Sequence, residues 1–149
     1  MSAPPVRVTY APEVFDAGSM EYARAIILTG EGSTTDERWA TETPYLCELI
    51  GNALALTAEK VVVDYGCGVG RLSKALIERY GCRVVGVDIS AKMRALAIDY
   101  VGSDRFFACP PEMLTGLAER GFRADAAFSV WVLQHCLNPR DDEIGRAHV

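Results

Sequence analysis

The residues whose types and spacing best suit a chemical role surround a glycine-rich segment. Gly66, Gly68 and Gly70 occupy alternate positions directly after the apolar run Val61–Val63 and before a helical pattern. Glycines at such a turn allow positive φ and let a ligand lie against bare backbone, while the following helix offers free amide groups. Because ligands of open α/β sheets bind beyond the carboxyl ends of the strands, this turn predicts a ligand-binding site.

Two aspartates flank this turn and indicate the kind of ligand. Asp64 stands at the end of the apolar run, where it would repel a pyrophosphate and suits a positively charged or ammonium group instead. Asp88 ends the next apolar run, and its two oxygens can accept hydrogen bonds from both hydroxyls of a ribose. A dinucleotide fingerprint would need a glycine where this chain has Arg71, so a nicotinamide-dependent oxidoreductase is the weakest hypothesis.

The elements that must position this turn follow an alternating pattern. Beyond Glu59, short β-branched runs alternate with helical segments, which is typical of a parallel sheet covered on both faces and joined by right-handed crossovers. The expected strands are 60–65, 83–87, 105–108 and 124–132. The expected helices are 71–80, a helix capped by Ser90 that runs to Tyr100, 111–120, and a last helix near Asn138-Pro139.

Residues 1–58 predict a helical section. We expect a helix over 20–28 capped by Ser19 and a second one starting at Thr35, with Thr43-Pro44 restarting it. Its expected buried stripe is formed by Leu46, Leu49, Ile50, Ala53 and Leu54. The whole net charge of −5 lies in this section, which has eight acidic and three basic side chains. The sequence thus predicts a helical cap section over 1–58 and a ligand-binding domain over 59–149.

Composition narrows the function classes. Half of the residues are hydrophobic, and the chain length fits a globular domain with a real core. No basic surplus is present to neutralise phosphates, which favours a small-molecule partner over nucleic acid. The five cysteines are widely spaced without a C-x-x-C pair, which argues against disulfides and a metal site. Without a secretory leader or an apolar run that could span a bilayer, we expect a cytoplasmic protein with no membrane partner.

The pattern D-x-G-x-G-x-G from Asp64 to Gly70, together with Asp88 followed by Ile89-Ser90, resembles the class I S-adenosylmethionine-dependent methyltransferases. Residues 122–135, where Asp125 opens a strand and His135 follows it, resemble a later motif of that family. The resemblance covers about residues 58–148. It implies a Rossmann-like open parallel sheet of order 3-2-1-4 with the later strands absent, S-adenosylmethionine as the cofactor, and methyl transfer to a small-molecule acceptor.

The same resemblance implies roles for individual residues. Asp64 would hold the amino group of the cofactor, Asp88 would bind its ribose, and the methionine part would pass along Gly66, Cys67 and Gly68. Other implied cofactor contacts, several of them around the adenine, are Ile89, Met93, Glu112, Met113 and Val130. Where the family often has an Asp after the third strand, this chain has proline, and Glu112 or the Met113 amide is expected to compensate.

For several further residues, a structural role is weighed against a functional one. His135 follows the fourth strand and is the candidate catalytic base for the acceptor, with a structural role as the alternative. We expect Asp125 to be structural, near a backbone amide, and Cys67 to serve packing. The aromatic residues of the first section either close over the cofactor or fill a core; they are Tyr22, Trp39 and Tyr45.

A second hypothesis concerns the length of the chain. The family implies seven strands, and too few residues follow the fourth one to form the rest. The alternative function is therefore a non-catalytic or incomplete cofactor-binding module that needs a partner. The apolar fourth strand over 126–132 would then be an exposed edge, so we expect self-association through it, as in a homodimer.

Overall fold

The computed structural model describes residues 12–28, 32–132 and 135 of the chain. The strands are β1 (Val61–Tyr65), β2 (Arg83–Val87), β3 (Phe106–Cys109) and β4 (Ala126–Phe128). They form a parallel sheet in the order β3-β2-β1-β4, which confirms the expected order. The helices are η1 (Pro12–Phe15), α1 (Met20–Ile27), α2 (Thr35–Ala53), α3 (Arg71–Tyr80), α4 (Ala91–Val101) and α5 (Pro111–Glu119).

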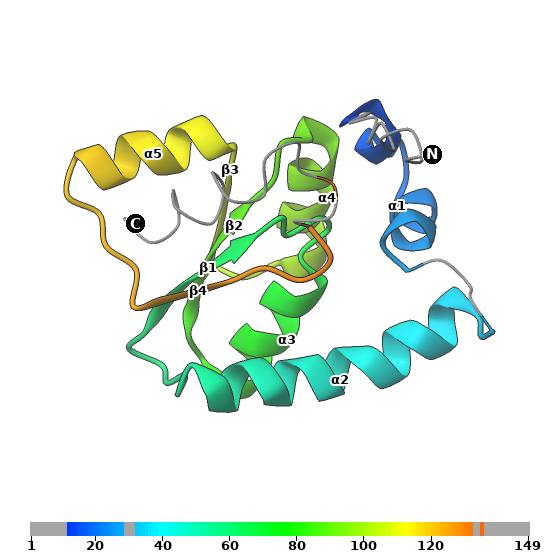
Figure 1. The fold of residues 1–149 in the computed structure, drawn as a ribbon, viewed down its shortest axis with the longest axis horizontal. Helices are drawn as coiled ribbons and strands as arrows, with labels where there is room; N and C mark the ends of the chain where they lie inside the picture. The colour runs from blue at the N-terminus through cyan, green and yellow to red at the C-terminus, as the bar shows by residue number, and fades with distance from the viewer. Residues whose placement is uncertain (1–11, 29–31, 133–134, 136–149) are drawn as a thin grey trace, which may run out of the picture.

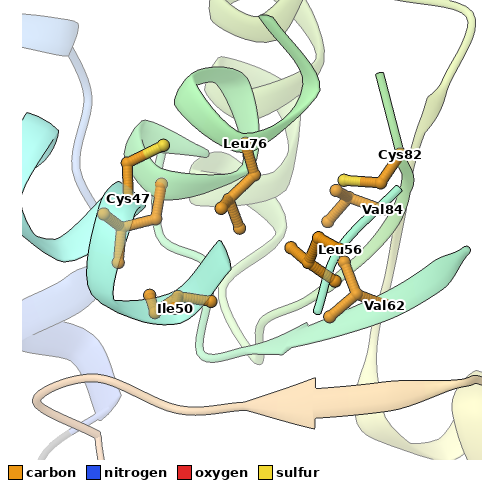
Figure 2. Close-up of a cluster of buried hydrophobic side chains, with 8 residues drawn as sticks. Cys47, Ile50, Leu56, Val62, Leu76, Cys82 and Val84 are labelled. Atoms are coloured by element: carbon orange, nitrogen blue, oxygen red, sulfur yellow. The ribbon is translucent and has the colours of Figure 1, made fainter. Parts of the chain in front are cut away.

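Helices cover both faces of the sheet, with α3 and α4 on one side and α5 on the other (Figure 1). Successive strand residues point to opposite faces, so Val62 and Val63 enter different core clusters. On the α3 side, strand valines pack with residues of α2 and α3, as Figure 2 shows for Cys47, Ile50, Leu56, Val62, Leu76, Cys82 and Val84. On the other side, Leu114 of α5 packs with Val63, Val85, Val87 and Cys109. The continuous apolar runs of β1 and β2 thus arise because both faces are buried.

The N-terminal helices pack on the sheet domain. Ser19 caps α1 as expected, because its hydroxyl accepts a hydrogen bond from the Tyr22 amide at 3.2 Å. A third core cluster joins Ala17 and Ala23 to Val69, in the glycine turn, and to Met93 of α4. These contacts bring η1 and α1 to the carboxyl edge of the sheet, where the turn lies.

The second helix starts at Thr35 as expected but differs from the expectation at Pro44. It is one continuous helix from Thr35 to Ala53 that contains Pro44, so the expected restart at Pro44 is wrong. Its N-cap is Thr34, whose hydroxyl accepts the Glu37 amide while the Glu37 carboxylate accepts the Thr34 amide, forming a capping box. This reciprocal pair stabilises the first turn of the helix, which begins at Thr35 as expected.

The buried stripe of α2 is also shifted. Leu49 is 52% exposed and Ala53 is exposed, so their expected burial is wrong. Cys47 and Ile50 are buried, and Leu46 and Leu54 pack against the same cluster. The shift arises because α2 docks on α3 through the face that carries these four residues.

The fourth strand is shorter than the expected 124–132. Only Ala126–Phe128 pair with β1. Beyond them the Ser129 hydroxyl donates a hydrogen bond to the Tyr65 carbonyl at 2.9 Å, and Trp131 has a φ of 60°. A side-chain bond followed by left-handed backbone ends the ladder, because neither continues an extended strand. The last helix expected near Asn138-Pro139 lies outside the described residues.

Candidate functional site

The glycine turn connects β1 to α3 and lies beyond the carboxyl end of β2. Gly66 and Gly68 have φ values of 80° and 54°, so the turn uses the left-handed backbone that glycine adopts readily. The amides of Gly66 and Cys67 both donate to the Val87 carbonyl, at 2.7 and 3.0 Å. The end of β2 therefore fixes the turn at the edge where ligands of such sheets bind.

Asp88 ties the turn to the next loop. Its Oδ2 accepts the Gly68 amide and its Oδ1 accepts the Ser90 amide, each at 2.9 Å. Burial raises the pKa of the Asp88 carboxyl, whereas the two backbone amides and Arg94 lower it. Each carboxylate oxygen has a second lone pair, so Asp88 can still accept hydrogen bonds from a ribose. The two backbone bonds preorganise that acceptor.

Asp64 is the buried acid of the site. Only 4% of its surface is exposed, and its Oδ2 accepts a hydrogen bond from the Ser73 hydroxyl at 2.7 Å. Burial raises the pKa of Asp64 to about 7, and the neighbouring Asp88 adds to this effect, while Ser73 and Arg71 oppose it. A carboxyl with such a pKa, placed beside a glycine turn, is typical of a functional group rather than of a surface acid.

Cys67 lies inside the turn but has no reactive character. Its side chain is buried and its Sγ lies near Gly86, where an added Cβ would come within 2.9 Å of it. Burial, together with Asp64 and Asp88, raises the pKa of the Cys67 thiol well above its usual value. Because the thiolate is the nucleophilic form, this thiol is inert near neutral pH.

The residues expected around the adenine do not share one environment. Ile89 and Met113 are each 46% exposed, and Glu112 is exposed beside Met113 in the first turn of α5. Met93 is instead 1% exposed and packs under the N-terminal helices. Val130 packs against the core cluster between α2 and α3. Contact of Met93 or of the half-buried Val130 with a ligand stays a prediction, and for Met93 it requires the cluster with Ala17 and Ala23 to open.

Side chains that the sequence did not single out lie against the turn. A Cβ on Gly68 would lie 3.0 Å from Cδ1 of Ile27 in α1, and one on Gly66 would meet the side chain of Val132. Neither contact has a signal in the sequence, because both join residues far apart in the chain. Together they place an apolar cover over the backbone that the methionine part of the cofactor was expected to follow.

His135 lies just beyond this cover. Its amide donates to the Val132 carbonyl at 2.9 Å, and its ring meets Phe15 of η1 edge to face, with ring centroids 5.2 Å apart. The imidazole is exposed. Since Val132 packs on Gly66, His135 lies at the same edge of the sheet as the turn. Its catalytic role stays a prediction.

Asp125 has the structural role that was expected. Its Oδ2 accepts the Val61 amide at 2.7 Å, and its own amide donates to the Val61 carbonyl at 2.8 Å. These two bonds set the register between β4 and β1 at the end of the sheet away from the turn.

The aromatic residues of the first section separate by environment. Trp39 lies near the guanidinium groups of Arg24 and Arg71, 4.5 and 5.5 Å from its ring centroid. Its ring also meets Tyr100 edge to face. These contacts join α2 to α1, α3 and α4 and favour the packing alternative for Trp39. Tyr22 and Tyr45 are 54% and 66% exposed.

Metal-binding clusters, membrane-spanning helices and disulfides are absent from the described part of the chain. No group of three or more His, Cys, Asp and Glu side chains within it is placed to hold a metal ion. None of the helices described is both long and apolar enough to cross a bilayer. The described cysteines are unpaired and buried, and Cys136 lies outside the described residues.

Comparison with known proteins agrees with this geometry. The family of the methyltransferase domain matches residues 63–144. A relative, N-demethylindolmycin N-methyltransferase of Streptomyces griseus, is 50% identical over 36 residues, which are 24% of this chain and 15% of the relative. That aligned stretch is short.

Solved structures share the fold. A protein of Methanococcus maripaludis assigned to the S-adenosylmethionine-dependent methyltransferases has a TM-score of 0.63 and 18% identity, over 98% of this chain and 62% of that one. An S-adenosylmethionine-dependent methyltransferase of Thiobacillus denitrificans, solved with S-adenosylhomocysteine, has a TM-score of 0.52 and 20% identity, over 70% of this chain and 44% of that one.

The matches cover less than two thirds of the length of each of these proteins. The family match, however, extends over more than half of this chain and includes the glycine turn, Asp88 and β4. With the parallel order β3-β2-β1-β4 and helices on both faces, the chain belongs to the methyltransferase domain family and has its Rossmann-like class I fold.

Proposed function

We propose that this chain binds S-adenosylmethionine and serves methyl transfer to a small-molecule acceptor. The observation that carries the proposal is the pair of acids on either side of the glycine turn. Asp64 is buried at the end of β1 and Asp88 bridges the Gly68 and Ser90 amides at the end of β2. A ligand with an ammonium group at one end and a ribose in the middle matches this pair.

The turn and the two acids account for cofactor binding. Asp64 accepts the ammonium group, and the backbone of Gly66, Cys67 and Gly68 lies along the methionine part. Asp88 accepts the ribose hydroxyls with the lone pairs that its two backbone bonds leave. The exposed side chains of Ile89 and Met113 offer apolar surface to the adenine.

The methyl transfer itself needs little chemistry from the protein. S-adenosylmethionine, when bound, supplies a methyl group on a positively charged sulfur. The work left to the chain is to align the acceptor with that methyl group and to exclude water. His135 lies at the same edge as the turn and is the group that we propose takes a proton from the acceptor.

A small molecule is the acceptor class that we favour. The net charge of −5 lies entirely in residues 1–58, and the rest of the chain is balanced, so no surplus of basic residues is present to hold a phosphate backbone. Of the relatives, N-demethylindolmycin N-methyltransferase has a small molecule in its name. The apolar side chains of Ile27 and Val132 over the turn suit an acceptor with an apolar surface.

Calorimetry with S-adenosylhomocysteine tests the proposal. We expect the chain to bind it and the Asp88→Ala variant to lose at least about tenfold in affinity, because the ribose acceptor and the anchor of Gly68 are removed together. Asp104→Ala is the matched control, since Asp104 is an exposed acid in the loop before β3. A folded wild-type protein that takes up no S-adenosylhomocysteine would contradict the proposal.

The alternative is a cofactor-binding module that is completed by another chain. The observation that favours it is β4, which pairs with β1 on one side and, within the described residues, with no strand on the other. We propose self-association through this edge, as a homodimer.

A cytoplasmic location fits the unpaired thiols of the described cysteines.

A further inference from the structure

Ser73 is a buried hydroxyl that the cofactor-binding roles above do not use. None of its surface is exposed, and it lies in the first turn of α3, directly after the glycine turn. Its Oγ donates a hydrogen bond of 2.7 Å to Oδ2 of Asp64 in β1. The bond thus joins the helix that follows the turn to the strand that precedes it.

This bond leaves the two oxygens of Asp64 in different states. Oδ2 is held by Ser73, whereas Oδ1 accepts no hydrogen bond from the residues that the structure describes. Oδ1 is not among the fully buried atoms that lack a partner in the described residues, so a donor brought by a ligand can reach it. The carboxylate is therefore oriented on one side and available on the other.

The charged and titratable neighbours of Asp64 come from each element around it. Asp88 at the end of β2 disfavours the negative charge of Asp64, and Arg71 at the start of α3 favours it. The Cys67 thiol in the turn has a raised pKa, to which Asp64 contributes, and it adds no charge near neutral pH. Phe128, its pairing partner in β4, carries no charge. None of these groups donates a hydrogen bond to the Asp64 carboxylate, so its orientation rests on Ser73.

The choice of a hydroxyl has a chemical consequence. A Lys or Arg in the place of Ser73 would orient Asp64 equally well, but its charge would satisfy the carboxylate and compete with a cationic ligand. A serine hydroxyl orients the carboxylate without neutralising it. The negative charge stays available for the ligand.

We propose that Ser73 is a positioning residue that holds Asp64 so that Oδ1 receives the ammonium group of the amino-acid part of the cofactor. This inference rests on the proposed function and adds to it the residue that selects the charged end of the ligand. Ser73 makes no contact with the reacting atoms and acts through Asp64.

Two ligands separate this role from a general structural one. S-adenosylhomocysteine carries the amino-acid part, whereas 5′-methylthioadenosine has the same adenosine and sulfur without it. We expect Ser73→Ala to lower the affinity for S-adenosylhomocysteine about tenfold in calorimetry, because a hydrogen bond to a charged group is lost. The affinity for 5′-methylthioadenosine should be unchanged. Ser73→Thr keeps the hydroxyl and should retain much of the affinity for S-adenosylhomocysteine.

A titration of the ligand-free protein gives a second readout. The carboxyl carbon of Asp64, followed by NMR against pH, should titrate at a higher pH in Ser73→Ala than in the wild type, because a donor to the charged form is gone. Ser73→Cys, which fills the same space with a weak donor, should show the same upward shift and replaces Ser73→Ala if that variant does not fold.

The outcomes are distinguishable. Equal losses for both ligands, or an unchanged Asp64 titration in Ser73→Ala, overturn the role of Ser73 and leave the proposed function standing. Failure of the wild-type protein to bind S-adenosylhomocysteine overturns the proposed function and the ammonium role with it.

Discussion

A buried carboxyl such as Asp64 reduces the free energy of unfolding of the ligand-free protein above neutral pH. Its pKa is raised from 3.8 to about 7, mainly by burial. Between these two values the folded state keeps a proton that the unfolded state has lost, so the free energy of unfolding falls as the pH rises through this window. Above about pH 7 the folded state has to hold the charge, and the full cost is present.

Asp64→Asn removes this titration. We expect the variant to be more stable than the wild type at pH 8 by up to about 4 kcal/mol, since each pH unit of displacement corresponds to about 1.4 kcal/mol, with a smaller difference at pH 5. The same variant should lose S-adenosylhomocysteine binding. Urea unfolding at both pH values measures the first effect, with Asp104→Asn as the control. A wild-type protein whose stability rises from pH 5 to pH 8 through Asp64 would contradict the sign.

The candidate site residues that form a local sequence pattern could be predicted from the sequence. Those that depend on contacts made by the fold could not. Asp64, Asp88 and the glycines stand at fixed distances around a strand end, which is a local pattern. Ser73 reads as an ordinary helix residue, because only the fold brings its hydroxyl to Asp64. Met93 has an apolar side chain at a position that predicts contact with the adenine. Its burial under α1 could not be predicted, because that packing depends on residues far away in the chain.

At the scale of elements, the glycine turn is the part that tolerates change least. Gly66 has a φ of 80°, and an added Cβ would meet Val132. We expect Gly66→Ala to destabilise the protein by about 1–3 kcal/mol and to abolish S-adenosylhomocysteine binding, because the left-handed backbone and the close contact are both affected.

Gly116 provides the matched control for this substitution. It lies within α5, and an added Cβ there meets no atom within 4 Å. Gly116→Ala should therefore raise the free energy of unfolding by about 0.5–1 kcal/mol, since alanine favours the helix more than glycine does, and should leave binding unchanged. Urea unfolding and calorimetry of both variants check the pair. Similar losses in the two would show that the turn has no special backbone requirement.

Element types and order were predictable, whereas several element ends were not. The spacing of apolar residues and the capping residues predict β1, β2, α3 and α4. Their predicted ends agree with the structure within a residue. Pro44 predicts a helix start, yet α2 continues through it because the residues before and after it dock along one line, Trp39 near Arg24 and Ile50 in the α3 cluster. β4 ends early because Ser129 bonds the Tyr65 carbonyl through its side chain.

At the scale of the whole molecule, the two parts of the chain are held together by apolar contacts more than by charge. The acidic N-terminal section meets the sheet domain through the cluster around Val69 and Met93 and through α2, whose Cys47 and Ile50 pack with Val62 and Leu76. The ion pair between Asp16 and Lys92, at 2.8 Å, joins two side chains that are each at least half exposed. Exposed pairs of this kind contribute about 0–1 kcal/mol, so the two apolar clusters carry the docking.

The outer edge of β4 is where we propose that a second chain binds. Ala127 is exposed within the strand, Trp131 is 57% exposed beyond it, and no strand among the described residues pairs with the outer side of β4. Unpaired backbone groups at such an edge form hydrogen bonds with a second strand, and lysine on the edge prevents this because its charge cannot be buried.

We therefore expect a dimer in sedimentation velocity and a monomer for Ala127→Lys. Thr115→Lys, which adds the same charge to the exposed surface of α5, should remain dimeric. Hydrogen exchange then locates the contact, since amides of 126–128 should exchange faster in Ala127→Lys than in the wild type; a wild-type monomer at every concentration, or a dimer unaffected by the lysine, would show that this edge is not the interface.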